Sequence, residues 1–81
     1  MEYIKKVLAG KELTIDNLIV CVQKIKEEGN VVVIKFDGER IENGYTIFIT
    51  FPNNEREMIR TDQNDLKNAL IEILKQYLLN K

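Results

Sequence analysis

Few residues in this chain could carry chemistry. It has no histidine and a single cysteine, Cys21, which removes the usual general base near neutral pH and both the Ser-His-Asp and Cys-His arrangements. The same inventory cannot build a tetrahedral zinc site, and no Asp-x-Asp-x-Asp-Gly calcium loop occurs. The four glycines stand far apart, so no phosphate-binding loop is predicted. We therefore expect no enzyme, no metal site and no cofactor.

Two features could still be catalytic, and both have a simpler interpretation. Cys21 lies within an apolar helical run, where a small core residue is the commoner role. Asp37, Glu39 and Glu42 gather near a predicted turn and could in principle perform acid–base chemistry. Because Arg40 is interleaved with them, we interpret this segment as a solvated, charge-balanced turn.

The elements that position these residues begin with helices. Apolar residues recur at three- and four-residue steps from residue 15 to residue 25, which predicts an amphipathic helix. Thr14 is suited to cap its start, and Gly29 is suited to end it. Residues 1–13 have weaker helical spacing and could form a short additional helix that ends at Gly10. A second main helix is predicted from the wide apolar stripe formed by Leu66, Ala69, Leu70, Ile73, Leu74 and Tyr77, with Thr61 or Asp62 as its cap.

Three strands are predicted between the two main helices. Residues 30–36 are rich in β-branched side chains, and residues 45–51 alternate so that Tyr45, Ile47, Ile49 and Phe51 share one side. A third, more polar strand is predicted over residues 55–61. Turn signals at Asp37-Gly38 and Asn43-Gly44 leave the link between the first two strands open, either as a loop or as an extended hairpin tip.

The predicted fold class is therefore α+β: a helix, a three-stranded antiparallel meander and a helix, with both main helices on one sheet face. This order, over about residues 14–79, resembles the topology of double-stranded RNA-binding domains. That family places lysines at the start of its last helix to contact phosphate, whereas residues 61–67 here read Thr-Asp-Gln-Asn-Asp-Leu-Lys. Two aspartates would repel phosphate, so the resemblance implies a shared architecture without a shared function.

The strands carry more apolar side chains than one buried face requires. If Ile47 and Ile49 point inward, Phe48 must point to the outer side of the sheet, together with alternate residues of the first strand. An apolar centre with basic residues around it suits a protein partner, a dimer contact or stacked bases. The competing explanation is that the N-terminal segment folds over this side. The predicted interaction surface consists of Val33, Lys35, Phe48, Arg56, Met58 and Arg60.

Composition limits the remaining possibilities. The 81 residues include 44% apolar and 31% charged residues, which predicts one small folded domain spanning residues 1–81. A net charge of -1 gives no overall attraction to nucleic acid or anionic lipid. One cysteine and no long apolar run favour a cytoplasmic protein without a membrane span. We expect a small protein-binding module of inhibitor, immunity or adaptor type, or a homodimer; the alternative is nucleic-acid binding through the basic and aromatic sheet face.

Overall fold

The order of elements confirms the predicted α+β architecture. The computed structural model describes residues 2–11 and 13–79. Along the chain it contains α1 (Glu2–Ala9), α2 (Ile15–Glu27), β1 (Val31–Phe36), β2 (Tyr45–Thr50), β3 (Ile59–Gln63) and α3 (Leu66–Leu79). The strands form an antiparallel meander in the order β1-β2-β3, and the short N-terminal helix is present as α1.

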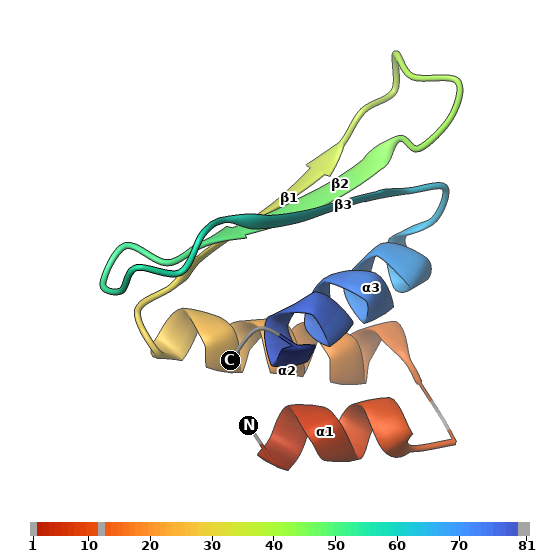
Figure 1. The fold of residues 1–81 in the computed structure, drawn as a ribbon. Coiled ribbons are helices and arrows are strands. Elements are labelled where there is room, and N and C mark those ends of the chain that lie inside the picture. The colour runs from red at the N-terminus through yellow and green to blue at the C-terminus, as the bar shows by residue number, and fades with distance from the viewer. Residues whose placement is uncertain (1, 12, 80–81) are drawn as a thin grey trace.

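The elements stack in three layers (Figure 1). The sheet forms one layer, and α2 and α3 lie together beneath one of its faces, where α3 packs on β2 and β3 and α2 packs on β1. Helix α1 contacts α2 and α3 on their other side, and it contacts no strand of the described chain. Both main helices therefore share one sheet face, and α1 forms the third layer away from the sheet.

Local sequence signals explain the ends of α2. The Thr14 hydroxyl accepts a hydrogen bond from the Asn17 backbone N–H at 3.1 Å, which satisfies one of the orphan amides of the first turn. At the other end the Gly29 N–H donates to the Lys26 carbonyl at 2.9 Å. Gly29 has φ of +90°, a backbone conformation that glycine adopts without the steric cost of a Cβ.

The segment before α3 differs from its prediction. β3 begins at Ile59 and continues to Gln63, so Asp62 is a strand residue and neither it nor Thr61 caps the helix. The cap is Asp65, whose carboxylate accepts from the Asn68 N–H at 2.8 Å. The prediction was wrong because several polar residues precede the apolar stripe, and spacing alone did not show which of them ends the strand.

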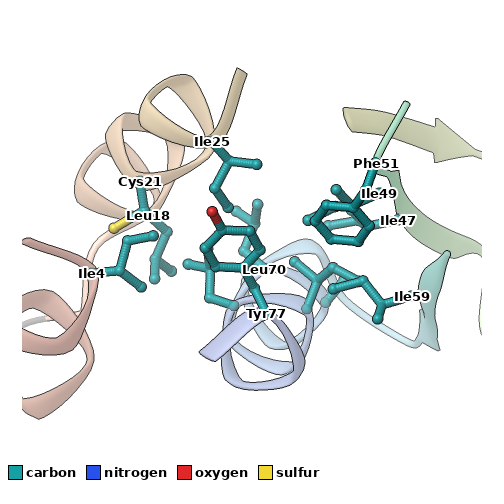
Figure 2. Close-up of a cluster of buried hydrophobic side chains, with 13 residues drawn as sticks. Ile4, Leu18, Cys21, Ile25, Ile47, Ile49, Phe51, Ile59, Leu70 and Tyr77 are labelled. Atoms are coloured by element: carbon teal, nitrogen blue, oxygen red, sulfur yellow. The ribbon is translucent and has the colours of Figure 1, made fainter. Parts of the chain in front are cut away.

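The buried side chains form one cluster around α3 (Figure 2). Tyr77 and Leu70 of α3 lie in the middle of it, with Leu18 and Cys21 of α2 on one side and the sheet residues on the other. Ile4 of α1 is fully buried against the helical layer. The wide apolar stripe of α3 is thus used on two sides, by the sheet and by the other helices.

Candidate interaction surface

The sheet has a second face that points away from the helices, here called the outer face. Ile47 and Ile49 are fully buried, and Val32 and Ile34 pack against the same core, so their neighbours along each strand point to the other side. The strand register arranges these neighbours in rows, in which Val33 pairs with Phe48 and Phe48 with Arg60. The outer face is formed by Val31, Val33, Lys35, Thr46, Phe48, Thr50, Arg60 and Asp62.

No element of residues 2–11 or 13–79 lies over the outer face. Phe48 and Val33 are half-buried by their neighbours and belong to no part of the core cluster, while Val31 is 47% exposed. The competing explanation was that the N-terminal segment covers this face. Helix α1 instead packs on the far side of the helical layer, which leaves the apolar centre of the face accessible.

Asp62 organises the polar end of the outer face. Arg60 donates to both of its oxygens at 3.1 and 3.2 Å, Arg40 reaches it at 3.2 Å from the β1–β2 link, and the Thr46 hydroxyl donates to it. The Arg60 guanidinium, followed by the Thr46 and Arg40 donors, holds the pKa of Asp62 well below its usual range. This carboxylate is therefore ionised and neutralises much of the basic charge around it.

The link between β1 and β2 is a loop and not an extended hairpin. The Glu39 N–H donates to the Asp37 carboxylate at 3.0 Å, a side-chain turn that short polar residues favour. The same carboxylate forms ion pairs with Lys35 at 3.5 Å and Arg40 at 3.7 Å. The backbone hydrogen bond to the Glu39 N–H, with these cations, lowers the pKa of Asp37. Asp37 thus serves the turn, as the sequence predicted for this acidic segment.

The structure separates Arg56 from the other predicted surface residues. Its guanidinium donates to the Gln76 and Tyr77 carbonyls at 2.9 and 2.8 Å, at the C-terminal end of α3. It also lies over the rings of Phe51 and Tyr77, 4.5 and 5.1 Å from their centroids. Phe51 belongs to the core, so grouping Arg56 with the outer face was wrong. The bend at residues 52–54 interrupts the strand alternation on which that grouping relied.

Met58 lies at the border of the outer face. It directly precedes the first residue of β3, the buried Ile59. Its side chain is 51% exposed. Of the six predicted residues, Val33, Phe48 and Arg60 therefore share one row, Lys35 lies in the next row, Met58 adjoins them, and Arg56 lies elsewhere.

Other features offer little for chemistry. Cys21 is fully buried in the core, and burial raises the pKa of its thiol, which disfavours the reactive thiolate. A pocket of about 290 Å³ opens beside the β1–β2 loop between Phe36, Arg40 and Tyr45. Its carboxylate, Asp37, is already held by two cations. Within the described residues, no three His, Cys, Asp or Glu side chains are grouped to hold a metal, and no helix has the length and apolar character to cross a membrane.

Sequence reasoning missed two residues of the outer face and one residue at the edge of β3. Thr46 and Asp62 stand on adjacent strands, paired in register, and their alternation with Phe48 and Arg60 could have identified them once the third strand was placed correctly. Gln76 was also missed; its amide donates to the Arg60 carbonyl at 3.0 Å from α3.

Comparisons with protein-family models, curated proteins and solved structures gave no match to this chain.

Proposed function

We propose that this protein is a binding module whose outer face docks a protein partner. The observation that carries the proposal is an aromatic residue, Phe48, at the centre of a sheet face over which no described element packs. Val31 and Val33 flank it on the neighbouring strand. Apolar side chains grouped on a sheet, with polar residues around them, are typical of protein interfaces.

The charges around Phe48 favour a protein over a nucleic acid. Arg60 is committed to Asp62 at 3.1 Å, Lys35 to Asp37 at 3.5 Å, and Arg56 lies elsewhere. A phosphate backbone would have to compete with these carboxylates and approach their negative charge. A protein surface with an apolar centre requires no such exchange, and the paired charges can remain as a solvated rim.

The test compares Phe48→Asp with a matched control, Ile41→Asp, which introduces the same charge at a fully exposed apolar residue in the β1–β2 loop. Both proteins should keep the wild-type circular dichroism spectrum, because neither side chain belongs to the core. A partner recovered by affinity purification from the source cells is purified, and its affinity is measured by titration calorimetry. Phe48→Asp should weaken binding at least about 30-fold, as expected for a central aromatic contact, and Ile41→Asp should not.

Two results would overturn the proposal. One is a partner that binds wild type and Phe48→Asp with equal affinity, which would place its site elsewhere. The other is salt-sensitive binding of single- or double-stranded oligonucleotides that is lost in Arg60→Ala and Lys35→Ala, which would identify the face as a nucleic-acid site.

A further inference from the structure

The free edge of β1 presents backbone groups that nothing in the described chain satisfies. The Asp37 N–H donates to the Gly44 carbonyl at 2.8 Å, one step beyond the Phe36–Tyr45 pair. Because backbone groups alternate in direction along a strand, the odd-numbered residues of β1 bond to β2 and the even-numbered ones point to the free edge. The N–H and C=O groups of Val32 and Ile34 therefore face outward, and no hydrogen bond from residues 2–11 or 13–79 reaches them.

The opposite edge of the sheet is protected in ways that β1 is not. At β3 the Gln76 side chain of α3 donates to the outward-facing Arg60 carbonyl at 3.0 Å, and α3 packs along the strand. β3 also carries Arg60 and Asp62, whose charges discourage strand addition. β1 has the sequence Val-Val-Val-Ile-Lys-Phe, with a single charge and no proline. Natural sheets seldom leave such an edge unpaired.

We propose that β1 pairs with β1 of a second copy of this chain, antiparallel about a two-fold axis at Val33, to form one six-stranded sheet. In this register Val32 and Ile34 exchange backbone hydrogen bonds with Ile34 and Val32 of the other copy, and Val33 meets its counterpart. The pairing uses the edge of β1 and not the outer face, so it stands apart from the proposed function.

The charges of β1 are compatible with a second copy as the occupant, and they exclude one alternative register. Lys35 is the only charged residue of β1, and it is partnered by Asp37 within its own chain. With the axis at Val33, each Lys35 lies opposite Val31 of the other copy, so the two lysines sit at opposite ends of the paired segment. A shift of the axis to Lys35 would place the two lysines directly opposite each other, which is destabilising. A second copy thus fits the edge without opposing like charges.

The way in which α2 covers β1 also fits this two-fold pairing, because α2 covers only the beginning of the strand. The sheet rises away from α2 along β1 (Figure 1), and exposure increases from the half-buried Val32 and Ile34 to Phe36, which is 64% exposed. Antiparallel pairing brings the uncovered end of each strand beside the covered beginning of the other. Phe36, which packs on Tyr45 of its own chain, would lie opposite Asn30 and diagonal to Val32 of the other copy, and so gain an additional apolar neighbour.

The first test measures amide hydrogen exchange by NMR at two protein concentrations, about 20 µM and about 1 mM. This concentration range suits the weak dimerisation expected of a small interface. At the concentration where nine-tenths of the chains are dimeric, exchange of the Val32 and Ile34 amides should slow about tenfold, since only free chains exchange. The Val33 and Lys35 amides, bonded to β2, report fold stability in the same sample. Binding of a partner to the outer face would leave Val32 and Ile34 unchanged, so the two proposals fail separately.

The second test is disulfide cross-linking of three single substitutions, Val33→Cys, Phe48→Cys and Arg60→Cys. At a non-hydrogen-bonded antiparallel pair the Cα atoms lie about 4.5 Å apart, within the range of a disulfide, so Val33→Cys should give a covalent dimer under mild oxidation. The wild type, whose buried Cys21 is its only thiol, is the background control.

Three results would overturn the pairing. They are a monomer by sedimentation velocity at about 1 mM, exchange at Val32 and Ile34 that does not depend on concentration, or cross-linking through Phe48→Cys or Arg60→Cys in preference to Val33→Cys. The last result would assign self-association to the outer face or to the β3 edge.

Discussion

Replacing Arg56 tests whether its side chain stabilises the fold, as its contacts indicate. The alternative, suggested by its position in the sequence, is that Arg56 contributes to a binding surface. Arg56→Ala removes two charge-assisted hydrogen bonds to the Gln76 and Tyr77 carbonyls, each contributing about 1.5–3 kcal/mol. It also removes the stacking on Phe51 and Tyr77, a contribution of about 0.5–2 kcal/mol. These contributions overlap, because one guanidinium makes all of them.

Two effects reduce the net cost. Among the described residues, the buried Arg56 Nε has no hydrogen-bond partner, a desolvation cost of about 1–3 kcal/mol that alanine does not have. Water can also reach carbonyls at a helix end once the side chain is gone. We therefore expect Arg56→Ala to lower the free energy of unfolding by about 2–3 kcal/mol, a large share of the roughly 4–12 kcal/mol expected for a chain of this length.

Urea denaturation at pH 7, followed by circular dichroism, measures this change. Arg56→Lys should fall between wild type and Arg56→Ala, because an ammonium keeps the charge at the helix end but not the planar fork. Arg60→Ala is the matched control: Arg60 pairs with Asp62 on the surface and is 48% exposed, so its loss should cost much less stability than the loss of Arg56. If Arg56→Ala costs no more than Arg60→Ala, the assignment of Arg56 to the end of α3 is refuted.

Two further predictions concern pH. Burial and the hydrogen bond to Glu28 raise the pKa of Tyr77 to about 12, above its value near 10 in the unfolded chain. The Tyr77 hydroxyl therefore contributes fully to stability below pH 10, and this contribution is lost as pH rises toward 12. Tyr77→Phe should accordingly show a smaller decrease of the urea midpoint at alkaline pH than wild type. The pKa of Asp62 is lowered in the folded protein, so the Asp62 carboxylate contributes fully to stability above its unfolded pKa of about 4, and this contribution is lost as pH falls below that value. The difference in unfolding free energy between wild type and Asp62→Asn should therefore decrease between pH 5 and pH 2. A difference that stays constant would contradict the stabilising role of the ionised Asp62.

The sequence predicted the fold where a strict period was sustained. The alternation from Tyr45 to Phe51 placed Ile47 and Ile49 in the core and Phe48 outside it, because a strand allows only two side-chain directions. The β3 region lacked such a period. Thr61, Asp62 and Asp65 are each suited to cap a helix, and only the pairing of β3 with β2 decides among them.

Arg56 illustrates why the candidate surface was harder to predict than the fold. The residues between Phe51 and Ile59 follow a bend, so their directions are not set by the alternation of either strand. Arg56 turns back toward α3 because the last carbonyls of that helix and the faces of Phe51 and Tyr77 together offer partners for a guanidinium. Partners so distant along the chain leave no local pattern in the sequence.

Both α3 and the strands carry more apolar residues than one buried face requires, and internal packing accounts for the extra residues of α3. The stripe of α3 is wider than one sheet face requires, and Ile71 and Leu78, which widen it, pack against the core in a layer that α1 also contacts. The surplus of the strands has no such explanation within residues 2–11 and 13–79, since α1 is already used on the opposite side of α2 and α3. The two proposals assign these two groups of atoms to different molecules, because side chains on a sheet face fit a partner of complementary shape, whereas open backbone groups fit another strand.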